Sequence, residues 1–491
     1  MKGYIKINPN DNVAVALKTI EIGEDVLGVK ATDVIPKGHK IALLDIEVDE
    51  DVIKYGYPIG HATKSINKGE HIHVHNVKTN LNDTLEYKYE PNLNDIPKIS
   101  KTFKGYKRLN GKVGIRNEVW IINTVGCINK SAEKIAEIAN RKYEINESFD
   151  GVYTFVHPYG CSQMGDDHEM TQEVLARLVE HPNAAAVLVL SLGCENNNLK
   201  EFKKVLGDVD TNRVKFLVAQ DVEDEIEKGT SIVDDLVAYT KSQKREEMSL
   251  DNLTIGLKCG GSDGLSGITA NPLVGRLSDL LIGAGGTSIL TEVPEMFGAE
   301  TILMNRCIDK KVFDDTVDLI NNFKDYYKSH DQVVYENPSP GNKDGGITTL
   351  EDKSLGCTQK GGLANVVNVL KYGETSKVKG LNLLQGPGND IVACTALTAS
   401  GANIVLFTTG RGTPLGSPIP TVKIASNNEL FKKKNNWCDF DASPVIDEKD
   451  LDTLANEFLD YIIQVASGEV YTKNEINGYR EISIFKDGVT L

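Results

Sequence analysis

Five hydrophobic runs in this chain stop at a cysteine inside a glycine-rich or polar loop. The cysteines are Cys127, Cys161, Cys194, Cys259 and Cys357. A helical pattern follows the first three, which places their thiols at the carboxyl ends of strands, where open α/β sheets bind ligands. Glycines beside them let the backbone turn sharply and approach a ligand closely. We therefore take Cys161, Cys194, Cys259 and Cys357 as candidate contacts to a metal ion or a substrate.

The spacing of these cysteines leaves two explanations open. Three or four thiolates that converge at strand ends could hold an iron–sulfur cluster. No C-x₂-C motif occurs, so the fold itself would have to bring the thiols together, and a thioredoxin-like or zinc-ribbon site is not expected. Buried, inert cysteines are common. We expect inert or substrate-contacting thiols rather than a cluster.

Histidines are concentrated near the start of the chain. Five of the nine fall within the first 80 residues. His71, His73 and His75 alternate with other residues, so they share one face if they lie on a strand. Imidazole suits zinc, iron and nickel. We predict that His73 and His75 are metal ligands, and the alternative is a solvated strand face.

Polar residues in other loops add further candidates, each with a structural alternative. His157 lies in a loop dense in titratable groups, which suggests a site, although Asp166 and Asp167 of the same loop also suit helix capping. Glu195 follows the most apolar strand, where it could act as a base or a metal ligand or cap the next helix. Asp263 lies in a Gly-Gly-Ser-Asp-Gly loop that could cradle a carboxylate or form a tight turn. Arg411 and Arg116 lie near glycines, where a guanidinium can bind a carboxylate through two bonds or remain in a surface turn.

Alternating strand and helix patterns from residue 105 onward predict a parallel, doubly wound α/β sheet. The first 80 residues instead contain short, partly alternating runs separated by turn signals, which indicates a small β-rich module. We expect the following parts: a β module over 1–80, a linker over 81–104, a first α/β domain over 105–248 and a second α/β domain over 249–491.

Individual elements of the two α/β domains can be read from the apolar patterns. We predict strands over 119–125, 151–156, 185–192, 214–219, 253–258, 287–291, 380–384 and 402–408, and helices over 131–142, 168–180, 222–241, 273–282 and 451–466. Residues 336–362 form a long Gly/Pro-rich stretch with no clear period, which indicates a functional loop. No G-x-G-x-x-G follows the first strand, so the dinucleotide-binding fingerprint is missing.

The overall composition excludes several classes of protein. The chain has 491 residues with 54 basic and 70 acidic side chains, a net charge of −16, which argues against nucleic-acid and anionic-membrane partners. We find no signal peptide and no apolar run near the roughly 18 residues that a membrane span requires. Eight cysteines are too few for a disulfide scaffold. We expect a cytoplasmic enzyme that acts on a small molecule, as a homodimer.

Several strings in the chain resemble one family closely. They include Lys54-Tyr-Gly-Tyr-Pro-Ile-Gly-His, Tyr159-Gly-Cys-Ser-Gln-Met-Gly-Asp-Asp-His, Cys259-Gly-Gly-Ser-Asp-Gly-Leu-Ser-Gly and Thr348-Thr-Leu-Glu-Asp-Lys-Ser-Leu-Gly-Cys. From about residue 1 to 445 the chain resembles the altronate/galactarate dehydratase family, and its N-terminal module resembles the SAF (β-clip) domain. The resemblance implies a hydro-lyase that converts D-altronate to 2-keto-3-deoxy-D-gluconate with the help of Fe²⁺ or Mn²⁺. Galactarate, or another hydroxy acid, is the alternative substrate.

That reaction needs a base for the proton next to the carboxylate, a cation that stabilises the enediolate, and assistance for the departing hydroxyl. We expect Arg411 and Arg116 to hold the substrate carboxylate, and His39, Lys54 or Tyr55 to act as acid or base. His157 and Asp263 complete the catalytic candidates, and Glu195 is a further candidate metal ligand. The site is expected between the SAF-like module and the strand ends of the larger part.

Two other classes of function are compatible with parts of the sequence. The SAF-like module could bind carbohydrate on a non-catalytic chain, but dense polar loops at five strand ends favour an enzyme. A dinucleotide-dependent oxidoreductase would also use a doubly wound sheet, and the missing glycine fingerprint argues against it.

Overall fold

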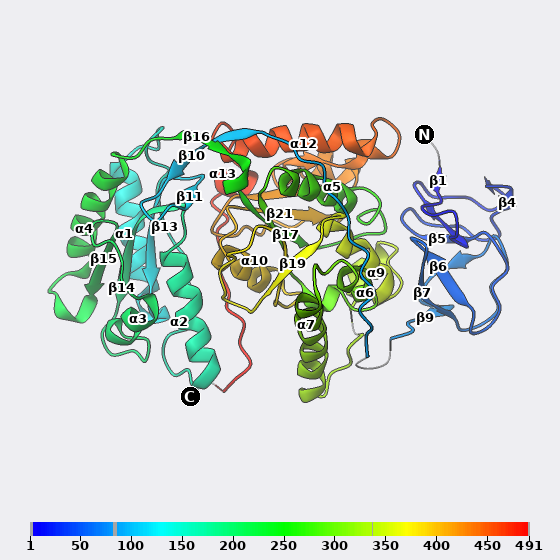
Figure 1. The fold of residues 1–491 in the computed structure, drawn as a ribbon, viewed down its shortest axis with the longest axis horizontal. Helices are drawn as coiled ribbons and strands as arrows, with labels where there is room; N and C mark the ends of the chain where they lie inside the picture. Colours follow the sequence, from blue (N-terminus) through cyan, green and yellow to red (C-terminus); the bar gives the residue numbers. More distant parts are fainter. Residues whose placement is uncertain (1–2, 82–85, 336, 490–491) are drawn as a thin grey trace.

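The computed structural model describes residues 3–81, 86–335 and 337–489, which fold into three parts arranged in a row (Figure 1). The order in space differs from the order in the chain. The domain that comes last in the sequence lies in the middle, with the N-terminal β module on one side and the first α/β domain on the other. No helix in the described part of the chain is long and apolar enough to cross a membrane.

The N-terminal module consists of short antiparallel strands, as the sequence predicts. β1, β2, β5 and β8 form one sheet, and β6, β7 and β9 form another. The strands are β1 (Tyr4–Ile5), β2 (Val13–Ala16), β3 (Asp25–Val26), β4 (Val29–Lys30), β5 (Lys40–Ala42), β6 (Asp51–Lys54), β7 (Tyr57–Ala62), β8 (His71–Ile72) and β9 (Val77–Lys78). Buried aliphatic side chains from both sheets fill the interior of the module.

The predicted strand over residues 71–77 is wrong in its extent. β8 ends at Ile72 and β9 begins at Val77, and a turn lies between them. In this turn the carbonyl of His73 accepts hydrogen bonds from the backbone N–H groups of Asn76 (3.0 Å) and Val77 (3.1 Å). His71, His73 and His75 therefore do not share a strand face, because only His71 lies in a strand.

The segment that follows the β module is not a free linker. Residues 86–101 have no regular secondary structure, but they run along the middle domain and bind to it. The Tyr89 hydroxyl donates to the carbonyl of Cys307 (2.7 Å). The backbone N–H of Asn92 donates to the carbonyl of Asn305 (2.7 Å). These contacts fix the path of the chain across the middle domain before it enters the first α/β domain.

The first α/β domain has the predicted parallel sheet, with the strand order β13-β12-β14-β15. Its elements are β12 (Glu118–Asn123), α1 (Asn129–Lys142), β13 (Val152–Thr154), α2 (Gly165–Val179), β14 (Ala184–Ser191), α3 (Leu199–Leu206), β15 (Val214–Val218) and α4 (Glu225–Thr240). All residues of β14 are buried, as a continuous Ala/Val/Leu run in a sheet covered on both faces requires. The entering strand β10 (Thr102–Lys107) pairs with the departing strand β16 (Glu246–Ser249), and β11 (Val113–Gly114) completes this small sheet.

The middle domain contains a parallel sheet with the strand order β19-β20-β18-β17-β21-β22-β23. The strands are β17 (Thr254–Cys259), β18 (Thr287–Leu290), β19 (Val366–Leu370), β20 (Gly380–Leu384), β21 (Ile404–Thr409), β22 (Thr421–Ala425) and β23 (Phe440–Asp441). After β17 the chain forms the strands on one side of the sheet, and after β21 it forms the strands on the other side. The topological switch point of this sheet therefore lies between β17 and β21. Ligands bind at such points in doubly wound sheets.

Helices cover both faces of the middle sheet. α5 (Ala270–Gly283) and α12 (Leu451–Ala466) pack on one face with Ile404 and Leu406 of β21, and α10 (Asp390–Ala399) packs on the other face with Val405 and Phe407. The second of these cores also includes Trp120 from β12, so the two α/β domains share one hydrophobic core. They therefore form a single packed unit.

In the predicted loop over residues 336–362, residues 337–362 are largely helical, and residue 336 lies outside the described residues. It contains α8 (Pro340–Asp344), α9 (Leu350–Cys357) and the 3₁₀ turn η5 (Thr358–Gly361). Every residue of α9 is buried, although the segment carries charged side chains and has no apolar period. α7 (Lys310–Ser329) is a further helix that the sequence patterns did not reveal. The predicted closing helix, in contrast, matches α12 in both bounds.

Candidate active site

Helix α9 lies between the N-terminal module and the sheet of the middle domain, and its side chains contact both. On the module side, the carboxylate of Asp352 accepts hydrogen bonds from Lys40 Nζ (2.8 Å) and Lys54 Nζ (2.9 Å). All three side chains are almost completely buried. Lys40 Nζ also donates to the carbonyl of Gly346 (2.7 Å). One carboxylate of the middle domain therefore holds two cations of the module.

Burial and pairing compete within this group of three charges. Burial favours neutral forms, but the two ammonium groups outweigh it and hold the pKa of Asp352 well below its usual range. At Lys40 burial has the larger effect and lowers the pKa to about 8, although the carboxylate of Asp352 favours the charged form. At Lys54, Asp352 and Tyr55 outweigh burial and raise the pKa above its usual value. Burial raises the pKa of Tyr55 to about 12.

Backbone atoms of the module and the middle domain meet directly beside this group. Within the middle domain, the N–H of Gly264 donates to the carbonyl of Gly345 (2.7 Å), and both glycines lie against Gly38 of the module. A Cβ atom on Gly264 would lie 2.1 Å from the carbonyl oxygen of Gly38 in the module, and one on Gly346 would lie 2.2 Å from the same oxygen. Only glycine fits at such distances. The glycines thus permit the close approach that the buried ion group requires.

Three histidines of the module gather at the same boundary. His39 Nδ1 lies 3.0 Å from His71 Nε2, and the ring centroids of His39 and His73 are 4.7 Å apart. His73 Nδ1 lies 3.2 Å from Thr348 Oγ1 of the middle domain. Burial, with neighbouring cations and imidazoles, lowers the pKa of His71 to about 4 and that of His73 to about 3, so both rings are neutral at pH 7. His75 is exposed and packs against His71, 5.3 Å between centroids.

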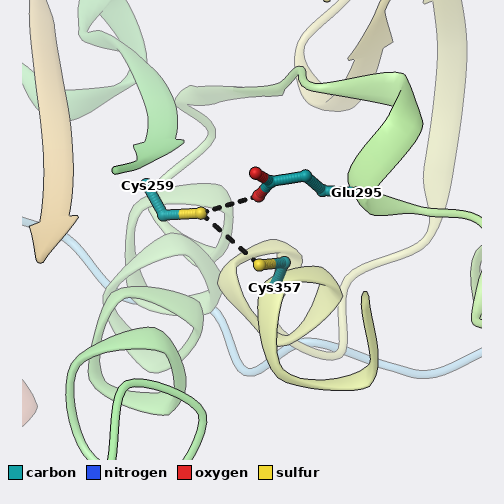
Figure 2. A group of neighbouring side chains, drawn as sticks. All are labelled: Cys259, Glu295 and Cys357. Atoms are coloured by element: carbon teal, nitrogen blue, oxygen red, sulfur yellow. Dashed lines mark hydrogen bonds between the residues drawn. The ribbon is translucent and has the colours of Figure 1, made fainter. Parts of the chain in front are cut away.

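On the sheet side of α9, two thiols and a carboxylate converge (Figure 2). Cys259 ends β17, Glu295 ends the 3₁₀ turn η4 (Val293–Glu295), and Cys357 ends α9; their side chains point toward one another. Cys259 Sγ lies 2.8 Å from Glu295 Oε2 and 3.4 Å from Cys357 Sγ. Within the described residues, this is the one group of three or more His, Cys, Asp or Glu side chains whose ligand atoms all lie within 4.8 Å of one another.

Buried lysines and carboxylates surround the two thiols. Lys353 Nζ pairs with Glu295 Oε1 (2.7 Å), and Lys258 pairs with Glu292 and with Asp390 Oδ1 (2.9 Å for the second pair). Burial opposes the charge of Glu295, but the neighbouring ammonium groups outweigh it and hold its pKa well below the usual range. The hydrogen bond to Cys259, together with burial, raises the pKa of the Cys357 thiol. The Glu295 carboxylate is therefore ionised while the Cys357 thiol keeps its proton.

A cleft leads from solvent to this cluster. It has a volume of about 760 Å³, and its lining includes Cys259, Glu295, Lys343, Lys353 and Asp390 together with the aromatic rings of Phe323, Tyr326, Tyr327 and Phe485. Gly260 and Gly261 also line it, at the switch point between β17 and β21. Arg411 N donates to the carbonyl of Gly261 (2.8 Å). The exposed Arg411 guanidinium has no side-chain partner among the described residues, so it is available to a ligand at the rim.

A smaller cavity lies on the other side of α9. Lys54, Tyr55, Asp352, Lys353 and Cys357 line it, together with Ser262 and Asp263. The hydroxyl of Ser262 is buried and has no hydrogen-bond partner among the described residues. Lys353 lines both cavities. The module's Lys54 and Tyr55 therefore reach the back of the cysteine cluster, as the sequence hypothesis of a site between the module and the strand ends requires.

The sequence matches models of one protein family over nearly its whole length. A model of the altronate/galactarate dehydratase SAF domain matches residues 2–80. A model of the D-galactarate dehydratase/altronate hydrolase second domain matches residues 105–241, and one of the D-galactarate/altronate dehydratase C-terminal domain matches residues 250–490. The chain belongs to the altronate/galactarate dehydratase family.

Known proteins resemble this member of the family along the full chain. Altronate dehydratase of Bacillus subtilis is 54% identical, with 100% of both chains covered. Altronate dehydratase of Escherichia coli is 52% identical over 99% of this chain and 100% of its own. Galactarate dehydratase (L-threo-forming) of Escherichia coli is 30% identical over 98% of this chain and 96% of its own.

Three of the predicted site residues lie away from the cleft of this dehydratase-family protein, in the first α/β domain. The buried Arg116 guanidinium binds Glu475 (2.7 Å) and backbone carbonyls. His157 lies with Nε2 2.9 Å from the carbonyl of Asn123, and its Nδ1 accepts from a backbone N–H. Glu195 accepts from Thr124, Ser191 and two backbone N–H groups, which outweigh burial and lower its pKa. These partners do not support the catalytic or metal-binding roles predicted for them.

The predicted cysteines fall into two groups. Cys259 and Cys357 meet in the cluster, whereas Cys161 and Cys194 lie at strand ends of the first α/β domain. The metal roles predicted for His73 and His75 stay predictions, and the module histidines do not converge as closely as the Cys259 cluster does. Asp263 is held by Ser266, Ser426 and Asn427, so it braces its loop at the edge of the small cavity.

Sequence reasoning missed the charged residues that hold the site together, including Lys40, Asp352, Lys258, Glu292 and Glu295. A lysine inside the apolar run that ends at Cys259 was a usable signal, because a lysine in a buried strand requires a carboxylate partner. The string Leu350-Glu-Asp-Lys had no such signal, since its burial depends on packing between the N-terminal module and the rest of the middle domain.

We expect the substitution Asp352→Asn to lower the free energy of unfolding by about 3–5 kcal/mol, because it leaves two buried ammonium groups without a counter-charge. Since the pKa of Asp352 is depressed in the fold, its stabilisation is complete above the unfolded value of about 4 and is lost as the pH falls below it. Denaturant unfolding at several pH values should show this acid-dependent loss of unfolding free energy in the unsubstituted protein and not in the variant. The matched control is Asp344→Asn, an exposed residue nearby. Equal stability of both variants would contradict the assignment.

Proposed function

We propose that this protein, a hydro-lyase of sugar acids, removes water from D-altronate to give 2-keto-3-deoxy-D-gluconate. The observation that carries the proposal is full-length identity above 50% to two proteins named altronate dehydratase, against 30% to one named galactarate dehydratase. A cleft that ends at two thiols and a carboxylate, with lysines around it and Arg411 at its rim, is consistent with an anionic substrate.

The donor set of the Cys259 cluster fits a divalent transition metal. Thiolates bind softer metals such as iron and zinc, whereas Mg²⁺ and Ca²⁺ prefer all-oxygen sites. We propose that Cys259, Glu295 and Cys357 would hold Fe²⁺, with Mn²⁺, which prefers oxygen ligands, as the weaker alternative, and that the two thiols would give up their protons when the ion binds. A divalent ion there supplies positive charge to stabilise the enediolate that forms when the proton next to the carboxylate leaves. The ammonium groups of Lys353, Lys258 and Lys360, the last of which lies 3.6 Å from Glu292 Oε2, would then balance the two thiolates and the carboxylates.

Residues of the chain itself bind the substrate. Lys343 lines the cleft, and Arg411 lies next to Gly261, which also lines it; both are cations that could hold the carboxylate, Arg411 through two parallel hydrogen bonds. The rings of Tyr326 and Tyr327 offer flat surfaces and hydroxyls to the sugar chain. Burial of Cys259 and Glu295 at the inner end of the cleft keeps water away from the reacting carbons.

Asp390 is the carboxylate in the cleft best placed to accept the proton. Its side chain is 37% exposed, and Lys258 Nζ holds Oδ1 at 2.9 Å. Its Oδ2 lies beside the residue after Cys259, because a Cβ atom on Gly260 would come within 2.7 Å of it. Glu295, the other carboxylate that lines the cleft, is already bound by Lys353 and Cys259. We propose that Asp390 is the general base.

Location and assembly remain predictions of the sequence. We propose that the enzyme works in the cytoplasm, where its eight free cysteines stay reduced, and that it is a homodimer. Light scattering of the purified protein measures the second property directly.

A direct assay tests the proposed reaction. The purified protein is stripped of metal, and Fe²⁺ or Mn²⁺ is restored under anaerobic conditions with D-altronate or galactarate as substrate. We expect formation of the 2-keto-3-deoxy acid from altronate, dependent on the restored metal, with kcat/KM at least about tenfold above that for galactarate, or roughly 1.4 kcal/mol of transition-state discrimination. A preference for galactarate would overturn the substrate assignment, and full activity after stripping would overturn the metal assignment.

The substitution Cys357→Ser tests the metal centre. Serine keeps the size of the side chain but is a poor ligand for Fe²⁺ in place of a thiolate. We expect the affinity for Fe²⁺, titrated anaerobically without sulfide, to fall by more than about 100-fold. A loss of about 100-fold is the largest that is typical when only a residue hydrogen-bonded to a metal ligand is changed, and the loss of a ligand should exceed it. Cys438→Ser is the matched control, because Cys438 is equally buried but lies outside the cluster. Unchanged Fe²⁺ binding in Cys357→Ser would place the metal elsewhere, for instance at His73 and His75.

The substitution Asp390→Asn tests the proposed base. Asparagine keeps the shape but cannot take up the proton, so we expect kcat to fall by about 10²–10⁴-fold with little change in KM. Asp314→Asn on the exposed face of α7 is the control. A variant that raises KM and keeps kcat would show that Asp390 binds substrate and that another residue removes the proton.

A further inference from the structure

A further cavity, the junction pocket, lies where the N-terminal module, the irregular segment 86–101 and the middle domain meet. It has a volume of about 430 Å³. The module contributes Tyr55 and Tyr57, the irregular segment contributes Asn92, and the middle domain contributes Arg306 and Leu355 of α9. Tyr57 and Asn92 are exposed, so the pocket is open to solvent. It shares no lining residue with the cleft that leads to the Cys259 cluster.

Side-chain amides dominate the polar part of this pocket. Five of them line it, from Asn8, Asn92, Asn94, Asn305 and Gln359. Among the described residues that line the pocket none is acidic and one, Arg306, is basic, although the whole chain has a net charge of −16. An amide offers both a donor and an acceptor, as a hydroxyl group does. The lining therefore matches a neutral, hydroxyl-rich molecule that carries one negative charge.

Many polar atoms of these amides have no protein partner. The side chains of Asn92 and Asn305 form no hydrogen bond within the described parts of the chain, although the backbone N–H of Asn92 donates to the carbonyl of Asn305 (2.7 Å). Asn8 Nδ2 is likewise unpaired. Gln359 Nε2 donates to two backbone carbonyls (3.0 and 3.1 Å), which fixes the side chain and leaves Oε1 free. The amides are thus positioned by the fold while hydrogen-bonding capacity remains for a ligand.

The guanidinium of Arg306 is buried without a paired anion. Arg306 is 6% exposed, its Nη1 donates to the carbonyl of Gly362, and its Nε is buried with no hydrogen-bond partner. The nearby carboxylate of Asp279 forms no ion pair with it and accepts instead from the backbone N–H groups of Leu363 (2.9 Å) and Ala364 (3.0 Å). Burial lowers the pKa of Arg306 to about 10. A carboxylate ligand would supply the missing charge through strong hydrogen bonds.

Aromatic and aliphatic side chains form the rest of the surface. The Tyr57 side chain is 48% exposed and its hydroxyl has no partner among the described residues, so it offers a flat apolar face and a polar tip. Ile7, Ile302 and Leu363 also line the pocket. Such surfaces suit the C–H groups of a carbon chain. A cavity of this volume falls in the usual range for sites of small molecules, roughly 300–1,000 Å³.

We infer that the junction pocket is a second binding site, separate from the catalytic cleft, for a polyhydroxylated carboxylic acid. Arg306 holds the carboxylate, and the amides of Asn92, Asn305 and Gln359 hold the hydroxyl groups. Binding there involves no covalent step. It does not require that altronate is the acid dehydrated in the cleft, because the lining of the pocket alone defines the class of ligand.

A ligand in this pocket contacts both partners of the buried ion group. Tyr55 follows Lys54, which pairs with Asp352, and Leu355 lies in the same helix as Asp352. A molecule that touches Tyr55 and Leu355 together is bound only while the module is packed against α9. Binding therefore stabilises the docked module by linkage. The pocket couples the supply of sugar acid to the integrity of the catalytic site.

The substitution Asn92→Cys in the full-length protein tests the site by placing a thiol in its exposed wall. The probe is D-gluconate, which has a carboxylate and several hydroxyls. At ten times its dissociation constant, D-gluconate should slow alkylation of the new thiol about tenfold, whereas D-glucitol, without a carboxylate, and acetate, without hydroxyls, should slow it less than about twofold. Mass spectrometry measures the rates, with the native exposed thiols of Cys127, Cys161 and Cys194 as internal standards. Asn435→Cys, at another exposed asparagine without a hydrogen bond, is the matched control.

Three further substitutions in the Asn92→Cys background identify where the probe binds. Arg306→Gln should raise the D-gluconate concentration for half-maximal protection by more than about tenfold, and Arg306→Lys should raise it less. Asn305→Ala, which removes no hydrogen bond of the protein itself, should raise it as well, so the test survives if the Arg306 variants do not fold. Asp390→Asn, which removes the proposed base from the cleft, should leave protection unchanged.

The inference and the proposed catalytic function fail in different ways. No protection by D-gluconate, or equal protection by D-glucitol or acetate, would overturn the second site and leave the dehydratase assay unaffected. Protection that disappears in the Asp390→Asn variant, or that is equally strong in the Asn305→Ala and Arg306→Gln variants as without them, would also overturn it, because the probe would then bind in the cleft or elsewhere.

Discussion

The buried contact of Asp352 with Lys40 and Lys54 is the interaction on which the architecture of the site depends. It joins two domains that are far apart in the chain, because the linker and the first α/β domain (residues 81–248) lie between them, and it does so at the one helix that also carries Lys353 and Cys357. A buried carboxylate with two ammonium partners tolerates little displacement, because any movement exposes an uncompensated charge to a low dielectric. The position of the N-terminal module and the position of Cys357 are therefore coupled through one short helix.

Helix α9 has no strong helical signal of its own. Its eight residues combine Glu351, Asp352, Lys353 and Ser354 with two leucines, and all of them are buried. Such a segment gains little from hydrophobic transfer, so its stability comes from fully satisfied polar partners on two sides. Asp352 faces the module and Lys353 faces Glu295. This arrangement explains how a polar sequence forms a buried helix. It also implies that the helix keeps this conformation only while the N-terminal module is packed against it.

Sequence patterns predict the parts of this structure in which local and global preferences agree. The parallel sheets and α12 follow from apolar runs whose period matches their final state, so their prediction is confirmed. The patterns fail where tertiary packing decides, as in α9 and in the turn that interrupts the predicted strand at His73. Candidate residues at strand ends such as Cys259 and Asp263 lie at the site because topology alone brings them there. Arg116 and Glu195 have side chains suited to a binding site, but in the fold they bind other parts of the protein, through Glu475 and Ser191.

The same sequence signal, a cysteine after a buried strand, leads to two different environments. Cys259 and Cys357 face each other within 3.4 Å and are buried among lysines and carboxylates, so positive charge is supplied there by side chains. Cys127, Cys161 and Cys194 are exposed in the loops after three neighbouring strands, and helices α1, α2 and α3 begin after these loops, so the positive ends of helix dipoles supply the charge. The two environments therefore differ in burial and in the source of their positive charge, and this difference follows from the fold rather than from the residues beside each cysteine.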